Sequence, residues 1–275
     1  MKLLDLVIDL AQQAGEVLRR HRLDTSMLKI VGETQGDVTR AIDLEVENRI
    51  ITRLKELDVP CLLVCEEHGL VKIGEDPKYV IVLDPLDGSA NYVSNLPFYS
   101  VSIAAGEYRP DVKLSDLKVS VVNYVPQNVM YISDVSTGTF KIEGQDIKFT
   151  EFPHEKPTFV LYLEPRDIEK MLKFLQKFWN KFPDLKVRIF GSASVEITQT
   201  LLRKFTAFID IRGKLRVVDI AGAYVMAKVL NAHMVDLKGR DLGEYKILDL
   251  PRFSLVVTYD DAVLRELLNI LSEVE

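Results

Sequence analysis

The sequence predicts a layered α/β sandwich, and two patterns along the chain support this prediction. An amphipathic helical pattern near the N-terminus is followed by short apolar strands, and helices and strands then alternate over the second half. Alternation of this kind is typical of sheets that are covered by helices. A polar segment between Pro153 and Pro157 divides the chain into an N-terminal half, residues 1–153, and a C-terminal half, residues 154–275.

The N-terminal half is expected to begin with two helices. Apolar residues at helical spacing predict an amphipathic helix over 3–20, and the polar, glycine-containing segment 24–38 is expected to be a loop. A second helix is expected to start near 37–39, where Asp37 or Thr39 can cap it, and to run to about Leu57. The expected strands of this half lie at 61–65, at 79–83 and in an antiparallel meander between Phe98 and Phe149.

The C-terminal half is expected to alternate between helices and strands, which indicates a second covered sheet. The expected helices lie at 167–180, 193–204, 218–231 and 261–272. The expected strands lie at 158–163, 186–190, 205–211, 233–237 and 254–258.

The composition is that of an ordinary globular protein and excludes two classes of partner. The 275 residues are 47% hydrophobic and 28% charged, with a formal net charge of −6. An acidic chain without a long basic run lacks the cationic face that binds a nucleic acid polymer. No stretch approaches the roughly 20 apolar residues that cross a bilayer. Acidic residues also interrupt the apolar N-terminus, so we expect a cytoplasmic protein without a signal peptide.

Residues 79–91 hold the most informative pattern in the chain. The apolar strand is expected to end on Asp84, because Pro85 cannot donate a hydrogen bond to a neighbouring strand. Asp87 follows in a tight turn with Gly88, which allows backbone N–H groups to face an anion. Two carboxylates at such a turn suit a metal ion beside a phosphate. From these residues alone, an ordinary polar turn explains the pattern equally well.

Acidic residues also stand at the ends of other expected elements. Glu66 and Glu67 follow the strand 61–65, Asp37 lies near a helix start, and Asp219 begins another helix. Each acid taken singly suits a helix cap or a solvated turn. Converging carboxylates repel one another unless cations lie between them, and oxygen ligands favour Mg²⁺. Two such ions can activate water and stabilise the leaving oxygen of a phosphate ester.

In these motifs the sequence resembles the inositol monophosphatase superfamily of Mg²⁺-dependent, lithium-sensitive phosphomonoesterases. The resemblance spans about 37 to 240, which is most of the chain, and it implies an α+β fold with an α-β-α-β-α sandwich, as in other sugar phosphatases. It also implies a homodimer. The motifs that carry it are Asp84-Pro85-Leu86-Asp87-Gly88-Ser89 with Asn91, Glu66-Glu67, Asp37-Val38-Thr39 with Asp43, and Val218-Asp219-Ile220-Ala221-Gly222.

The resemblance implies two metal positions. One Mg²⁺ would be bound by Glu66, Asp84 and the carbonyl oxygen of Leu86. A second Mg²⁺ would be bound by Asp84, Asp87 and Asp219. These ligands are all oxygen atoms, as a hard divalent cation requires.

The resemblance further implies the residues that act on the phosphate. Glu67 and Asp37 would hold a weaker third ion or its waters. Ser89, together with Asp37, would orient the attacking water, and the N–H groups of Gly88 and Ser89 would hold the phosphate. No covalent phosphoenzyme is implied.

A basic run before Asp219 bears on the substrate. Arg212, Lys214 and Arg216 lie within five residues, and inositol-preferring members carry a glutamate at the position of Arg212. Cations here suit a second phosphate on the substrate, although a solvated hairpin end carries such a run equally well. The pattern is similar to archaeal-type members that accept both fructose 1,6-bisphosphate and inositol phosphates. By the same resemblance, the other substrate-lining residues would be Gly191, Ser192 and Ala193, with Arg188 nearby.

We therefore expect a Mg²⁺-dependent phosphatase that cleaves the 1-phosphate of fructose 1,6-bisphosphate and also myo-inositol monophosphate. A nucleotidase of the same fold, acting on 3′(2′),5′-bisphosphates, is the alternative, since Arg212 suits that substrate too. A catalytically silent metal- or phosphate-binding regulator is a third reading. The complete set of candidate ligands together with Ser89 argues against it.

Overall fold

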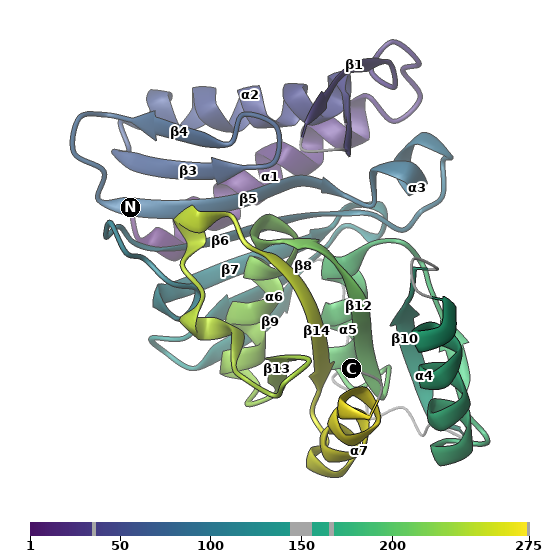
Figure 1. Cartoon of the computed structure of the whole chain (residues 1–275). Helices are drawn as coiled ribbons and strands as arrows, with labels where there is room; N and C mark the ends of the chain where they lie inside the picture. Colours follow the sequence, from purple (N-terminus) through teal and green to yellow (C-terminus); the bar gives the residue numbers. More distant parts are fainter. Residues whose placement is uncertain (35–36, 144–155, 165–167, 274–275) are drawn as a thin grey trace.

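The computed structural model of the chain has helices and sheets in the layer order α-β-α-β-α (Figure 1). It describes residues 1–34, 37–143, 156–164 and 168–273. The outer layer on one side is formed by α1 (Leu3–Arg20) and α2 (Ala41–Glu56), and the middle layer by α5 (Ala193–Leu201) and α6 (Val217–Val229). The outer layer on the other side is formed by α4 (Ile168–Lys181) and α7 (Asp261–Ser272). The predicted layered sandwich is therefore confirmed.

The larger sheet has seven strands and lies between the first helical layer and the middle layer. The strands follow in the order β4 (Leu70–Ile73), β3 (Cys61–Cys65), β5 (Tyr79–Asp87), β6 (Ser100–Glu107), β7 (Leu117–Tyr124), β8 (Val129–Asp134) and β9 (Thr139–Glu143). Strands β3 and β5 run parallel to each other, and all other neighbours in this sheet run antiparallel.

The smaller sheet has five strands and separates the middle layer from α4 and α7. Its strands follow in the order β11 (Lys186–Arg188), β10 (Thr158–Tyr162), β12 (Ala207–Arg216), β14 (Arg252–Thr258) and β13 (His233–Asp236). β10 is parallel to both of its neighbours, whereas β14 is antiparallel to both of its own.

The segment expected to be a loop over 24–38 instead carries an antiparallel hairpin, so that expectation was wrong. The strands β1 (Ile30–Thr34) and β2 (Asp37–Arg40) pair with each other, and α2 begins at Ala41, after the expected 37–39. Polar residues and Gly32 suggested a loop. The β-branched residues between them are those that favour extended pairing.

Strand β5 continues past Pro85 to Asp87, so the expected end at Asp84 was also wrong. The register against β6 shifts between Asp84 and Asp87, which is a bulge. Proline is tolerated at a bulge because no ladder hydrogen bond is required of it there. The two acids therefore lie on either side of a local kink rather than beyond the sheet.

The two halves of the chain share one core between the sheets. Val80 and Val82 of β5 pack in the same buried cluster as Phe208 of β12 and the apolar face of α6. The expected boundary near residue 153 falls outside the described residues, so the division into halves stays a prediction. The remaining short helices are α3 (Ser89–Val93), η1 (Leu114–Asp116), η2 (Val125–Gln127), η3 (Leu242–Glu244) and η4 (Ile247–Asp249). None of the helices in the described ranges combines the length and the apolarity that crossing a membrane requires.

Candidate active site

Four acids predicted from the sequence line one cavity of about 350 Å³. Strands β3 and β5 are parallel, with Cys65 opposite Leu83, so Glu66, which follows β3, and Asp84 of β5 lie at the same end of the two strands. Asp87 follows in the bulge of β5, and Asp219 comes from the first turn of α6. The other residues that line the cavity are Leu86, Gly88, Ser89, Ala90, Tyr162, Gly191, Ala193, Arg212, Leu215 and Arg216.

Asp84 is the most strongly perturbed of these acids. Only 1% of it is exposed. Its Oδ1 accepts the N–H of Leu86 at 3.1 Å, while its buried Oδ2 has no hydrogen-bond partner within the described part of the chain. Burial, followed by the nearby charges of Glu66 and Asp87, raises the pKa of Asp84 well above its usual value. An unpaired buried carboxylate is costly, so this oxygen is a position that a cation would stabilise.

Asp87 is held by the start of α5. Its Oδ1 accepts the N–H of Ala193 at 3.0 Å, and its Oδ2 accepts the N–H of Ser194 at 2.8 Å and the hydroxyl of Ser192 at 2.6 Å. Burial raises the pKa of Asp87, and the hydrogen bonds from Ser192 and Ser194 oppose that rise. Ser192, predicted to line the substrate site, therefore donates to a candidate metal ligand and is itself fully buried.

Arg216 is paired with two of the four acids. Its Nη1 lies 2.6 Å from Oε1 of Glu66, and its Nη2 lies 3.1 Å from Oδ1 of Asp219. Its backbone N–H also donates to Oδ2 of Asp219 at 2.7 Å. Burial raises the pKa of Glu66 to about 8, although the positive charge of Arg216 opposes this rise.

A buried glutamate of α2 holds the turn that follows β3. The carboxylate of Glu47 is fully buried and accepts the backbone N–H groups of Glu67, at 2.8 Å, and of His68, at 2.9 Å. Nδ1 of His68 lies 2.5 Å from the same carboxylate. Thr39 of β2 donates its hydroxyl to Glu67. Because the side chain of Asp37 lies outside the described residues, its predicted contact with Glu67 stays a prediction.

Asp43 is a further buried acid near this turn, 4% exposed. It accepts the N–H of Arg40 at 2.9 Å at the start of α2. Burial raises the pKa of Asp43 to about 7. The hydrogen bond from Arg40 opposes this rise, and the negative charge of Glu67 adds to it. The sequence motif contained Asp43 without giving it a role.

The wall of the cavity beside the central motif depends on glycine at two positions. Gly88 has φ of 88°, and a Cβ there would lie 3.0 Å from the carbonyl oxygen of Phe98. Gly191 has φ of 84° and a Cβ there would meet the side chain of Asn91. The amide of Asn91 donates to Phe98 O at 2.7 Å and to Phe190 O at 2.6 Å. Asn91 thereby joins the turn after β5 to the loop before α5.

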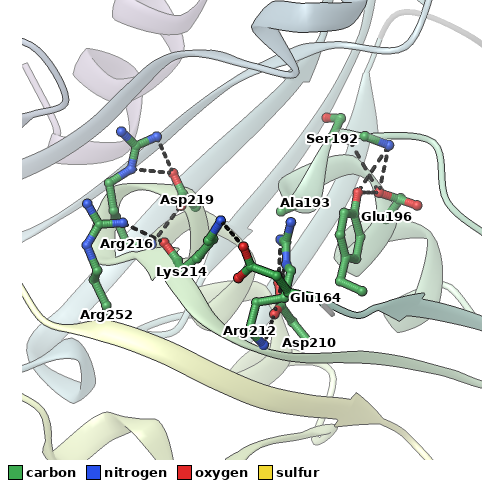
Figure 2. A network of polar contacts seen from close by, with 12 residues as sticks. Glu164, Ser192, Ala193, Glu196, Asp210, Arg212, Lys214, Arg216, Asp219 and Arg252 are labelled. Atoms are coloured by element: carbon green, nitrogen blue, oxygen red, sulfur yellow. Dashed lines mark hydrogen bonds and ion pairs between the residues drawn. The ribbon is translucent and has the colours of Figure 1, made fainter. Parts of the chain in front are cut away.

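A second buried glutamate shapes that loop. Glu196 accepts the N–H groups of Phe190, at 2.8 Å, and of Gly191, at 3.2 Å, and also the hydroxyl of Tyr162. Burial raises the pKa of Glu196 to about 7, and the hydrogen bond from Tyr162 opposes the rise. Figure 2 shows Glu196 beside Ser192 at the right of the view, with Asp219 at the left.

The predicted substrate-binding arginines occupy different places. Arg212 lines the cavity, where its Nη2 lies 2.6 Å from Oδ2 of Asp210 and its guanidinium lies 4.3 Å from the ring centre of Tyr162 (Figure 2). Arg188 is exposed and donates to the carbonyl oxygen of Val187. It lies outside the set of described residues that line the cavity.

The chemistry of the acids fits a magnesium site, although their side chains are now engaged elsewhere. Within the described ranges, no three His, Cys, Asp or Glu side chains stand ready to hold a metal ion. Glu66 and Asp219 instead pair with Arg216, and Asp87 accepts hydrogen bonds from the start of α5. Four carboxylates in one cavity, one with an unpaired buried oxygen, still form the oxygen-only donor set that Mg²⁺ prefers.

Three residues of the site were missed by sequence reasoning, Glu47, Tyr162 and Glu196, and Asp43 was part of a motif without a role. The available signal was weak. Asp43 and Glu47 lie one helical turn apart, and Glu47 follows the buried Val46 on a face that is otherwise apolar. A charged residue on an apolar helix face is buried only when it is paired, which indicates a partner but not its identity. Nothing in the sequence near Tyr162 indicates that its hydroxyl contacts the loop before α5.

Comparison with known proteins places the chain in a family. The family model described as "Inositol monophosphatase family" matches residues 2–270, so the chain belongs to this family. A fructose-1,6-bisphosphatase/inositol-1-monophosphatase of Archaeoglobus fulgidus is 30% identical over 253 residues, covering 88% of this chain and 89% of the relative. A fructose-1,6-bisphosphatase of Pyrococcus furiosus is 25% identical over 236 residues, covering 86% and 84%.

Two further comparisons differ in coverage. A bifunctional NADP phosphatase/NAD kinase of Methanococcus maripaludis is 30% identical over 222 residues, but the match spans only 38% of that longer relative and 75% of this chain. A solved inositol monophosphatase of Thermotoga maritima superposes with a TM-score of 0.72 at 20% identity, covering all of this chain and 98% of that one. At this identity the structural likeness shows the fold alone.

Proposed function

We propose that this chain is a Mg²⁺-dependent phosphomonoesterase that acts on fructose 1,6-bisphosphate and on myo-inositol monophosphate. The observation that carries the proposal is the unpaired, buried Oδ2 of Asp84 in a cavity that also receives Glu66, Asp87 and Asp219. The names of the relatives support the same substrate class. Lithium sensitivity, a cytoplasmic location and a homodimer belong to the same proposal.

The carboxylates of this chain would hold the ions. Glu66, Asp84 and the carbonyl oxygen of Leu86 would form one position, and Asp84, Asp87 and Asp219 the other. Bound Mg²⁺ supplies Lewis-acid chemistry at such a site, with a lower pKa for water and stabilisation of developing negative charge. Serine hydroxyl and backbone N–H donors around Asp87 limit how far its carboxylate can turn, which favours a defined geometry.

Residues of the turn after β5 would bind the phosphate and the water. The N–H groups of Gly88 and Ser89 would donate to phosphate oxygens, because the left-handed conformation of Gly88 starts α3 at the cavity wall. The hydroxyl of Ser89, with the carboxylates of Asp37 and Glu67, would hold the attacking water. The charge of Glu67 also acts on Asp43, which is a further candidate for accepting the proton of the attacking water.

Arg212 would favour substrates with a second anionic group. Its guanidinium is held by Asp210 and by the ring of Tyr162, so its remaining donors are presented to the cavity with little loss of side-chain freedom. Hydrogen bonds to charged groups contribute about 1.5–3 kcal/mol. Lys214, paired with Glu164 at 2.8 Å, and the exposed Arg188 would contribute through long-range attraction only.

A substrate panel tests the proposed function. Phosphate release would be measured with Mg²⁺ for fructose 1,6-bisphosphate, myo-inositol 1-phosphate, adenosine 3′,5′-bisphosphate and NADP. We expect the first two to be preferred. A preference for adenosine bisphosphate by about tenfold or more, or about 1.4 kcal/mol, would favour the nucleotidase. No release from any of them would favour a silent binding protein.

The proposed assembly has its own test. Analytical ultracentrifugation at micromolar protein concentration should give twice the monomer mass if the chain is a homodimer. A monomeric sedimentation coefficient would contradict the homodimer. The proposed two halves, residues 1–153 and 154–275, would be tested by co-expressing them as separate chains and measuring whether the pair purifies together.

A further inference from the structure

Arg216 places a fixed positive charge among the carboxylates that are proposed to hold Mg²⁺. Its guanidinium lies 2.6 Å from Glu66 and 3.1 Å from Asp219. The three side chains are 18%, 15% and 10% exposed, respectively. Water and salt screen such partly buried pairs less than surface pairs, so these contacts are stronger than an ordinary exposed salt bridge.

The backbone confines this guanidinium to the acid cluster. Arg216 is the last residue of β12 and immediately precedes α6, and its N–H donates to Oδ2 of Asp219 at 2.7 Å. Nε and Nη2 both lie within 3.3 Å of Oδ1 of the same residue. Figure 2 shows Arg216 joined to Asp219, whereas Arg212 of the same strand joins Asp210. The two arginines therefore have separate partners.

The contacts of Arg216 overlap with those that a metal ion would need. Glu66, Asp84, Asp87 and Asp219 carry four negative charges when all are ionised, and Arg216 cancels one of them. In the proposed assignment Glu66 ligates one ion and Asp219 the other, and the guanidinium already contacts one oxygen of each, Oε1 of Glu66 and Oδ1 of Asp219. An ion bound by either carboxylate would lie close to the guanidinium, and two cations repel each other strongly at such distances.

We propose that Arg216 is a built-in counter-cation that competes with Mg²⁺ for Glu66 and Asp219 and so sets the affinity of the site for the ion. The proposal rests on the metal-ligand assignment of the proposed function. Without the ion, Arg216 keeps the two carboxylates together across the boundary between β3 and α6. When the ion enters, the ion pairs of Arg216 must break, and this requirement weakens ion binding. Arg216 is therefore a positioning residue, because it acts through Glu66 and Asp219 and not on the substrate.

The first test removes the charge. Arg216→Met keeps an unbranched side chain that replaces the aliphatic stem of the arginine without its charge, and Mg²⁺ binding would be measured by calorimetry without substrate. We expect binding to tighten about tenfold, which corresponds to about 1.4 kcal/mol. The melting temperature in EDTA should fall, because Glu66 and Asp219 lose their partner. Arg212→Met is the matched control. It removes the same charge from the same cavity wall but from a pair with Asp210, so Mg²⁺ affinity should change far less.

The second test follows a signal of the wild-type protein, and a variant serves only to assign that signal. The NMR signal of the Arg216 Nε–H group would be assigned by its absence from Arg216→Lys. We expect this proton to exchange slowly with water in EDTA and to shift and exchange faster as Mg²⁺ is added.

Three results would overturn the proposal. One is unchanged or weaker Mg²⁺ binding in Arg216→Met, and another is a wild-type Nε–H signal that does not respond to Mg²⁺. If wild-type protein binds no Mg²⁺ and releases no phosphate, the proposed function fails as well. Normal turnover with an unresponsive Arg216 would remove the counter-cation proposal alone, so the two failures are distinguishable.

Discussion

The carboxylate of Asp87 accepts the backbone N–H of Ser194 at 2.8 Å and thereby joins the end of β5 to the first turn of α5. It also accepts the N–H of Ala193 at 3.0 Å. The first N–H groups of a helix lack partners within the helix, and Asp87 satisfies two of them from another part of the chain. One side chain of the central motif therefore serves both the candidate site and the packing between the two sheets.

Asp87→Asn should separate these two roles. Asparagine keeps one oxygen for the α5 N–H groups, so the free energy of unfolding should fall by only about 1 kcal/mol. Turnover should fall on the order of a hundredfold or more, since a charged ligand of the proposed ions is lost. Ser194→Ala is the control, because it removes a donor to Asp87 but leaves the charge. Phosphate release and urea unfolding measure both effects, and normal turnover in Asp87→Asn would refute the two-metal assignment.

Asp84→Asn should change stability in opposite directions with and without Mg²⁺. In EDTA the variant should be more stable than wild type, because it replaces a buried, partly unpaired carboxylate by a neutral amide. With Mg²⁺ the order should reverse, since a ligand at 100 times its Kd stabilises the protein that binds it by about 2.7 kcal/mol. Thermal unfolding under both conditions checks this. A variant that is less stable in EDTA would show that Asp84 is satisfied without an ion.

Glu47→Gln should destabilise the turn that carries Glu66 and Glu67. The amide group of glutamine would face at least one donor that the carboxylate now accepts. An unsatisfied buried donor costs about 1–3 kcal/mol, so we expect a loss of about 2 kcal/mol in urea unfolding. Glu45→Gln, an exposed position of the same helix, is the matched control and should change stability by less than about 0.5 kcal/mol. Equal effects at both positions would contradict the structural role of Glu47.

Glu196 should give the stability of the protein a pH dependence. Burial raises its pKa from 4.5 to about 7, so between these values the folded state keeps a proton that the unfolded state releases. The free energy of unfolding contributed by this group therefore falls as the pH rises through that window. Glu196→Gln lacks the titration, so the advantage of wild type over the variant should be larger at about pH 5 than at about pH 8. Urea unfolding in EDTA measures this, and an advantage that grows with pH would contradict the assignment.

Arg212→Gln should change substrate preference rather than chemistry. The variant loses a guanidinium that is held beside Tyr162 at the cavity wall. The kcat/KM for fructose 1,6-bisphosphate should fall by about tenfold, which corresponds to about 1.4 kcal/mol. The value for myo-inositol 1-phosphate should change by much less. Arg188→Gln, at an exposed position outside the cavity wall, is the control. Equal losses for both substrates in Arg212→Gln would argue against a second anion subsite.

Much of the fold could be predicted because the helices of the two outer layers show an apolar face in the sequence. The helix expected over 3–20 is α1, Leu3–Arg20, and the helix expected over 261–272 is α7, Asp261–Ser272. Pairing between strands was harder to predict, since it depends on residues that are distant in sequence. The β1–β2 hairpin and the bulge at Pro85 are both of this kind. In each, a local rule about glycine or proline was outweighed by the partner strand.

The candidate site was predictable to the level of which acids meet. Glu66, Asp84, Asp87 and Asp219 line one cavity, as the ends of their elements indicated. What each acid contacts could not be predicted. That Ser192 donates to Asp87, and that Arg216 pairs with Glu66, depends on side-chain directions that the fold alone determines. The hydrogen bonds and ion pairs of these acids, and not only their positions, determine how their negative charges are compensated.

The core that the two sheets share between them has a kinetic consequence. Glu66 follows β3 and Asp84 lies in β5 of the same sheet, while Asp219 starts a helix that packs between both sheets, so the proposed position formed by Asp84, Asp87 and Asp219 is incomplete before the sheets have docked. Contacts that form only after the transition state change the rate of unfolding and leave the rate of folding almost unaltered. Magnesium should therefore lengthen the lifetime of the native protein without hastening its formation.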